Sequence, residues 1–193
     1  MADLHIIPAF LTKNPCFTAG RKIAVKGLML HSVGCPQPHP GPFLQDWNRA
    51  DFNRACVHAF IDAENGDVFQ TLPWNARGWH AGGTLNNTHI GIEMCEPSDL
   101  KYLDDFHFEC ANREEALVQV KRTYETAVEL FASLAKQFGL DPLGDGVIIS
   151  HHEGHLRGLA SGHQDPEHLW RGLGAPYSMA GFRQSVYARL AEA

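Results

Sequence analysis

Apolar residues occur along the chain in short runs separated by turn-forming residues, and these runs predict β-strands. The residues Glu64, Asn65 and Gly66 lie between two of the runs and predict a hairpin turn, because Asn and Gly tolerate positive φ. Stretches rich in Gly or Pro at 34–42 and 74–87 predict loops. Five strands are predicted, at 23–30, 56–62, 67–72, 89–94 and 146–150.

One long stretch has helical periodicity. Its apolar residues between 117 and 138 recur at steps of three and four, which places them on one face of a helix. Asn112 with Glu115 three residues later is typical of a helix N-terminus, and Gly139 and Pro142 predict the end. Shorter helices are predicted around 43–47 and at about 179–190.

These elements together predict the fold class. Strands mixed with helices favour a single α/β domain with a central mixed β-sheet flanked by helices, although the strand order does not follow from the pattern. A chain of 193 residues suits one domain with a sizeable core. We expect one domain over 1–193, with its core at about 22–172 and a C-terminal helix beyond the core.

Composition and charge narrow the range of partners. Hydrophobic residues make up 44% of the chain and the formal net charge is −6. Without a basic patch or stripe, nucleic acid is not an expected partner. No apolar run approaches the ~18 residues that span a bilayer, and the first residues lack a secretory signal pattern. We therefore expect no membrane partner and synthesis in the cytoplasm without a signal peptide. Five cysteines without paired spacing predict buried thiols in a reducing compartment.

Candidate metal chemistry is concentrated in one segment. Residues 151–166 include four histidines and two carboxylates, and they follow the apolar run 147–149. Neutral imidazole and carboxylate are common zinc ligands, and a catalytic zinc takes three protein ligands plus water. A second apolar run, at 28–30, also ends in a histidine, His31. The two strand ends together predict a metal site.

Four blocks of sequence carry a resemblance to a known family. The blocks are LMLHSVG at Leu28, VHAFIDAENGDVFQTLPWNARGWHAGG at Val57, NNTHIGIEMCEP at Asn86 and SHHEGHLRGLASGHQDPEHLW at Ser150. In this order they resemble the zinc-dependent N-acetylmuramoyl-L-alanine amidases of the type 2 amidase and peptidoglycan-recognition superfamily, most of all a branch from Gram-positive bacteria and their phages. The resemblance implies a catalytic domain that hydrolyses the amide bond between N-acetylmuramic acid and L-alanine in peptidoglycan.

The resemblance also implies the ligands of one zinc ion: His31, His151 and Asp165. His152 is the alternative to His151, and because neighbours on a strand face opposite sides, only one of the two is expected to face inward. Asp165 has the alternative role of capping a turn before Pro166.

Two further residues are implied to take part in the chemistry. Glu93, on an otherwise small or apolar strand, matches the carboxylate that accepts a proton from the attacking water, as a general base. Some members use a tyrosine instead, but Val57 occupies that position here. His163 stands where many members carry a lysine that stabilises the oxyanion, and an imidazole N–H can still donate to that oxygen.

Three residues match positions that line the cleft in the family. His58 and His80 are expected to contact substrate or to support residues that do, and Trp79 offers a flat apolar face to a sugar or peptide. His155 and His168 are expected at the surface.

Two other functions stay open. A non-catalytic muropeptide-binding domain shares the fold but usually lacks a zinc ligand, and a zinc peptidase or deacetylase would act on another substrate. The setting is open as well: a phage lysis enzyme, a recycling enzyme or a domain of a longer protein. The sequence does not indicate an oligomeric state.

Overall fold

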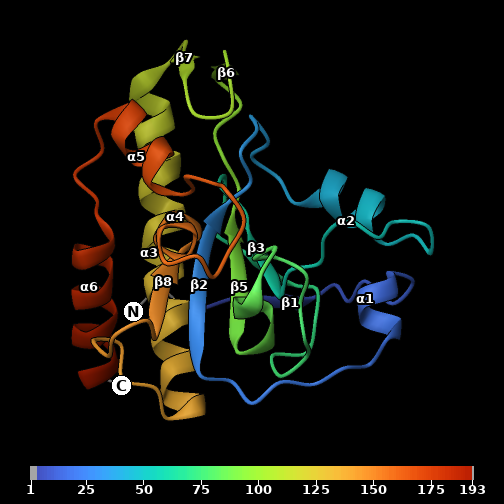
Figure 1. Cartoon of the computed structure of the whole chain (residues 1–193). Helices are drawn as coiled ribbons and strands as arrows, with labels where there is room; N and C mark the ends of the chain where they lie inside the picture. Colours follow the sequence, from blue (N-terminus) through green and yellow to red (C-terminus); the bar gives the residue numbers. More distant parts are fainter. Residues whose placement is uncertain (1–3, 193) are drawn as a thin grey trace.

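A computed structural model describes residues 4–192. Its centre is a six-stranded sheet with the strand order β1-β4-β3-β5-β2-β8 (Figure 1). All neighbouring strands run parallel except β3 and β4, which pair antiparallel, so the predicted mixed sheet is confirmed. The strands are β1 (Ile6–Pro8), β2 (Gly27–Ser32), β3 (Ala59–Ile61), β4 (Val68–Gln70), β5 (His89–Met94) and β8 (Ile148–Ser150).

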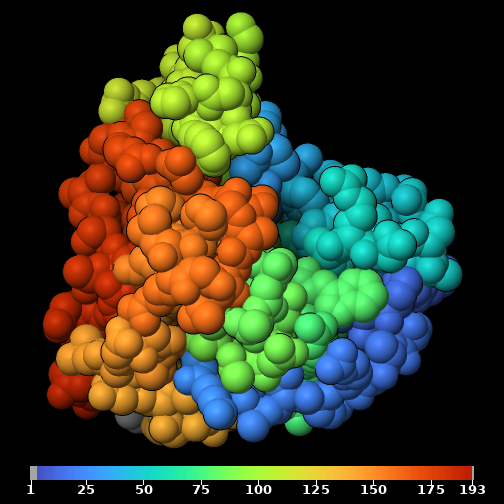
Figure 2. All heavy atoms as spheres, in the orientation of Figure 1, coloured from blue at the N-terminus to red at the C-terminus, as the bar shows by residue number. Residues whose placement is uncertain are grey.

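Helices flank the sheet and a small hairpin projects from it (Figures 1 and 2). The hairpin consists of β6 (Leu100–Tyr102) and β7 (Phe108–Cys110). The helices are α1 (Pro15–Thr18), α2 (Gly41–Trp47), the 3-10 helix η1 (Thr84–Asn87), α3 (Arg113–Phe138), α4 (His151–Leu156), α5 (Glu167–Leu173) and α6 (Met179–Ala191). None of the helices within residues 4–192 combines the length and the apolar character needed to cross a bilayer.

Helix α3 forms as its sequence predicts. The Asn112 side chain accepts a hydrogen bond from the Glu115 N–H, and Gly139 ends the helix with a φ of 64°. The apolar face of α3 packs against the sheet and against α6, where Phe131 and Phe182 are fully buried with ring centroids 5.1 Å apart. Burial of each such ring contributes about 1.5–3 kcal/mol. This core includes residues of α6, so the C-terminal helix is part of the same packed unit.

The observed strands differ in detail from the predicted ones. The strands predicted at 56–62 and 67–72 are shorter, and β2 begins later and continues past His31. The strands β1, β6 and β7 were not predicted, whereas the equally short β3 and β4 were, because a hairpin turn signal lies between them.

The prediction that His151 and His152 lie on a strand is wrong. Ser150 ends β8, and its hydroxyl accepts from the Glu153 N–H at 2.9 Å while the Glu153 carboxylate accepts from the Ser150 N–H at 3.2 Å. This capping box starts α4 at His151. Successive helical residues are about 100° apart, so His151 is buried and His152 half-buried without the strict alternation of a strand.

The register of the parallel strands determines where the polar residues meet. Strand β2 pairs with β5 so that His31 lies opposite Glu93, and it pairs with β8 so that Leu30 lies opposite Ser150. The carboxyl ends of β2, β5 and β8 therefore meet at one edge of the sheet, where α4 begins (Figure 1).

Candidate metal centre and active site

Three side chains meet at this edge of the sheet. His31 Nδ1 lies 3.0 Å from His151 Nδ1 and 3.2 Å from Asp165 Oδ2, and His151 Nδ1 lies 3.5 Å from Asp165 Oδ1. All three residues are buried. Among residues 4–192, they form a cluster whose ligand atoms all lie within 4.8 Å of one another. Ligands of a tetrahedral zinc with bonds of about 2.0–2.1 Å stand about 3.3 Å apart, so this spacing fits such an ion.

The hydrogen-bond partners of His31 assign its tautomer. His80 Nε2 donates to the carbonyl oxygen of His89 at 3.1 Å, which leaves His80 Nδ1 as an acceptor in the neutral ring. Burial lowers the pKa of His80 well below its ordinary value, so the ring is neutral. His31 Nε2 lies 3.0 Å from His80 Nδ1 and is therefore the donor. In a neutral His31 the lone pair then belongs to Nδ1, the atom that faces Asp165.

The same reasoning applies to His151. The Ser161 hydroxyl donates to the Ala81 carbonyl oxygen at 3.3 Å, so its oxygen accepts from His151 Nε2 at 3.1 Å. Burial lowers the pKa of His151 to about 3, which makes it a neutral imidazole with its lone pair on Nδ1. Two nitrogen lone pairs and a carboxylate thus face one another at close range. Such an arrangement repels unless a cation or a proton lies between them, so the donor set fits a metal.

The charge around His31 favours a cation. Burial alone would lower the pKa of His31, but the hydrogen bond to Asp165 and the nearby carboxylate of Glu93 outweigh it and raise the pKa. A protonated His31 donates from Nδ1 to the carboxylate of Asp165, which lowers the pKa of Asp165 despite its burial. The site therefore stabilises positive charge at its centre.

Glu93 lies beside this cluster and lines the cleft in front of it. Its Oε2 is shielded from solvent and has no hydrogen-bond partner among the described residues. Burial raises its pKa to about 8; the positive charge of His31 opposes this rise, and the negative charge of Asp165 adds to it. A carboxyl group with this pKa can take up and release a proton near neutral pH.

His163 lies on the loop between α4 and α5. Its ring stacks on the ring of His151 with centroids 4.4 Å apart, and its Nδ1 lies 3.8 Å from Asp165 Oδ1. The side chain is 59% exposed, so it faces the cleft from the solvent side.

The three remaining predicted residues separate into two groups. Trp79 and His80 line the cleft. His58 is fully buried and does not: its Nε2 donates to the Ala76 carbonyl oxygen at 2.9 Å and its Nδ1 accepts from the Gly91 N–H at 3.0 Å. Its ring packs edge-on against His80 with centroids 5.7 Å apart, so its contact is with His80 and not with the cleft.

The prediction for His168 is wrong, whereas His155 is exposed as expected. His168 is 3% exposed, and its Nε2 lies 2.8 Å from the hydroxyl oxygen of Tyr102. Its position in the first turn of a helix, beside the apolar Leu169 and Trp170, was the signal that the sequence offered.

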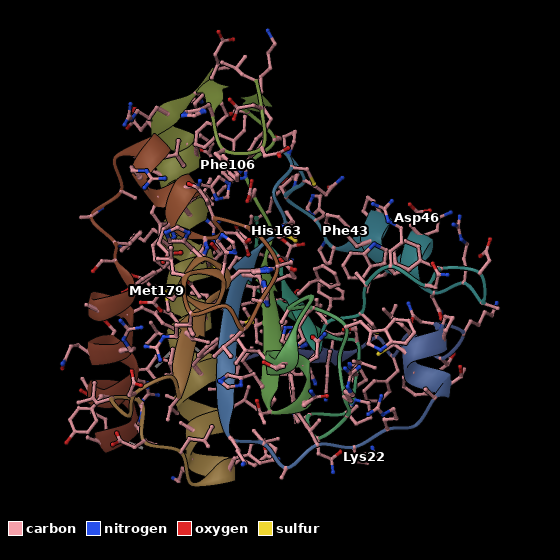
Figure 3. The ribbon with its side chains drawn as sticks, viewed as in Figure 1. Lys22, Phe43, Asp46, Phe106, His163 and Met179 are labelled. Atoms are coloured by element: carbon pink, nitrogen blue, oxygen red, sulfur yellow. The ribbon has the colours of Figure 1, made fainter. Side chains whose placement is uncertain are left out.

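The cleft has a volume of about 770 Å³. One wall comes from α2 and the loop after it, where Phe43 stacks on the buried Phe60 and Trp47 stacks on Phe52, with centroids 5.2 Å and 5.5 Å apart. The opposite wall is the segment 161–165, with the β6–β7 hairpin above it. Figure 2 shows the opening between the orange segment and the cyan helix α2, and Figure 3 places Phe43 and Asp46 on one side and His163 on the other. The aromatic wall was not predicted, because its rings come from a region without periodicity.

Known proteins resemble this chain in sequence and in fold. A family model (Amidase_2) described as N-acetylmuramoyl-L-alanine amidase matches residues 20–168. A stretch of 39 residues, 19% of this chain, is 46% identical to the N-acetylmuramoyl-L-alanine amidase XlyA of Bacillus subtilis (strain 168). That match spans only 13% of XlyA.

Solved structures share the fold at low sequence identity. The Staphylococcus aureus hydrolase AmiA, solved with its ligand, is 16% identical with a TM-score of 0.68, over 97% of this chain and 83% of that one. The catalytic domain of XlyA is 19% identical with a TM-score of 0.64, over 95% and 99%. PlyL is 14% identical with a TM-score of 0.65, over 97% and 98%. The match of the family model covers more than half of the chain, and the chain therefore belongs to the N-acetylmuramoyl-L-alanine amidase family.

Proposed function

We propose that this chain is a zinc-dependent amidase that hydrolyses the bond between the lactyl group of N-acetylmuramic acid and the L-alanine of the stem peptide. The observation that carries this proposal is the pair of histidines whose hydrogen bonds direct both Nδ1 lone pairs at Asp165. With the family membership, this donor set supports one zinc ion per chain, held by His31, His151 and Asp165.

The chemistry at the proposed site divides between the metal and the protein. A zinc ion held there would polarise the scissile carbonyl and lower the pKa of a water molecule. Glu93 accepts the proton of the attacking water and passes it to the leaving amine, a role that its raised pKa and its unpartnered Oε2 support. A nearby cation lowers that pKa again, so Glu93 is ionised when the site is loaded.

His163 donates an N–H to the oxyanion that forms on the carbonyl oxygen. Its stacking on His151 holds the ring at the mouth of the site, where a substrate carbonyl can approach. The hydrogen bond to His80 fixes the tautomer of His31, and the ring of His58 packs edge-on against the ring of His80.

The cleft accounts for a substrate with both sugar and peptide parts. Trp79 and the rings of Phe43 and Trp47 offer flat apolar surfaces beside the metal centre, and carbohydrate rings and aliphatic side chains pack on such surfaces. We propose peptidoglycan as the partner, the cell wall as the place of action, and residues 1–193 as one catalytic domain with α6 inside its core.

The test is mass spectrometry of purified peptidoglycan after digestion, with and without a chelator. The proposal requires new L-alanine amino termini without new reducing sugar ends, and loss of this product after zinc removal. A protein that binds muropeptides and releases nothing is a recognition domain. Release of acetate, or cleavage within the stem peptide, identifies a deacetylase or a peptidase.

A further inference from the structure

One buried carboxylate near the proposed metal centre belongs to neither the ligands nor the base. Glu96 follows β5 and has no exposed surface. Its Oε1 accepts from the Gly34 N–H at 3.0 Å, and its Oε2 accepts from the Tyr102 hydroxyl at 2.6 Å. The Tyr102 oxygen also lies 2.8 Å from His168 Nε2. Burial of a carboxylate costs several kcal/mol, and these hydrogen bonds offset part of that cost.

The partners of this carboxylate come from the segments that carry the proposed site. Gly34 is three residues after His31, and His168 is three residues after Asp165. Glu96 itself is three residues after the proposed base, Glu93. A single buried network thus connects the ends of three segments that are far apart in the sequence.

The direction of the hydrogen bonds follows from the donors. The Gly34 N–H can only donate, and an ionised Glu96 can only accept, so the Tyr102 hydroxyl donates its single proton to Glu96. The Tyr102 oxygen is then free to accept from His168 Nε2–H. The Tyr102 hydroxyl bonds to both Glu96 and His168, whereas Glu96 Oε1 and His168 Nε2 are 4.0 Å from each other.

Asp165 itself also bonds to β2 and α4. His31 Nδ1 lies 3.2 Å from Asp165 Oδ2, the Ser32 N–H donates to the same oxygen at 3.4 Å, and the Asp165 carbonyl oxygen accepts from the His152 N–H at 3.2 Å. The Ser150 hydroxyl, next to His151, donates to the Glu167 carboxylate at 2.8 Å and so connects the segment of His151 with the segment of Asp165. The network through Tyr102 connects the segment of His31 with the segment of Asp165 in the same way.

We propose that Glu96 and Tyr102 are positioning residues, which hold the segment of Asp165 against the segment of His31 so that their ligand atoms stay at metal-binding distance. The inference rests on the proposed function, since it concerns the same zinc site. Neither residue lines the cleft or belongs to the proposed ligand set.

The test is the zinc dissociation constant of Tyr102→Phe, measured by competition with a chromogenic chelator. This change removes one oxygen atom and leaves the ring packed against Phe108. We expect the dissociation constant to rise roughly tenfold, within the 10–100-fold range for residues that support metal ligands. The matched control is Tyr177→Phe, whose ring stacks on Tyr124 in the core at 4.0 Å and should bind zinc like the parent.

A second arm separates positioning from a general loss of stability. If Tyr102 acts through Asp165, then Tyr102→Phe should cause little further loss of zinc affinity in an Asp165→Asn background. An equal loss in both backgrounds overturns the inference, and so does an unchanged dissociation constant in the single variant. A parent that binds no zinc overturns the proposed function and this inference together.

Discussion

Gly91 offers a sharp test of how the proposed zinc ligand His31 is oriented. A Cβ at this position of β5 would lie 2.4 Å from Cγ and 2.5 Å from Nδ1 of His80. Ordinary contact begins near 3.4 Å, so the ring must retreat by about 1.0 Å (3.4 − 2.4 = 1.0). The bond from His31 Nε2 to His80 Nδ1 is 3.0 Å long and does not survive such a shift.

The expected magnitude has two parts. Overpacking in a closed core costs about 1–3 kcal/mol of unfolding free energy. Loss of the partner that fixes the tautomer of His31 should weaken zinc binding by roughly 10–100-fold, or about 1.4–2.7 kcal/mol. Gly91→Ala should therefore melt at a lower temperature as the metal-free protein and also hold zinc less tightly, as measured by calorimetric melting and chelator competition.

Two further variants isolate the cause. Gly41→Ala adds a methyl group with no atom within 4 Å, so it should match the parent in both measurements. In Gly91→Ala/His80→Ala the clash is gone, so stability should recover relative to Gly91→Ala while zinc affinity stays low. Parent-like zinc affinity in Gly91→Ala would refute the role given to His80.

Three further predictions concern the ligands, the base and pH. His151→Ala should lose the zinc found by metal analysis and His152→Ala should retain it; the reverse result would exchange their roles. Glu93→Gln should retain zinc while kcat falls by roughly 10²–10⁴-fold, and near-normal turnover would remove Glu93 from the mechanism. Burial raises the pKa of Glu96 to about 7, against about 4.3 in unfolded chains. Between these values the folded protein holds a proton that the unfolded chain has lost. Glu96 therefore lowers the unfolding free energy as pH rises from about 4.3 to about 7, by roughly 4 kcal/mol in all. In denaturant titrations of the metal-free protein at pH 5 and pH 8, Glu96→Gln should lack this decline. If the unfolding free energies of the parent and of Glu96→Gln differ by the same amount at both pH values, this prediction is wrong.

Helices and strands of this fold were predictable where the sequence has a clear periodicity or a capping signal. Helix α3 has both signals, and it begins and ends where Asn112 and Gly139 predict. The family and the mixed sheet were also predicted, because motifs on separate strands keep their order. The assignment of site residues remains a prediction, although the structure brings His31, His151 and Asp165 together.

Other features depend on contacts that no local pattern records. The start of α4 was missed because the alternation of a strand was extended from Ser150 through His151 and His152, and the capping box of Ser150 and Glu153 was not recognised. The hydrogen-bond network of His168 and Glu96 includes Tyr102, which comes from a hairpin that was not predicted. Sequence separation hides such a network, since each member looks like an ordinary surface residue.

The wide spacing of the three proposed ligands along the chain would make a bound metal ion a cross-link. His31 and Asp165 are 134 residues apart, so an ion held by both closes most of the chain into a loop, as a disulfide would. An ion that binds only the folded chain adds about 4.1 kcal/mol of stability at a thousand times its dissociation constant. The stability of the folded enzyme would then depend on the concentration of free zinc around it. A chelator would make the protein unfold more readily as well as stop its catalysis.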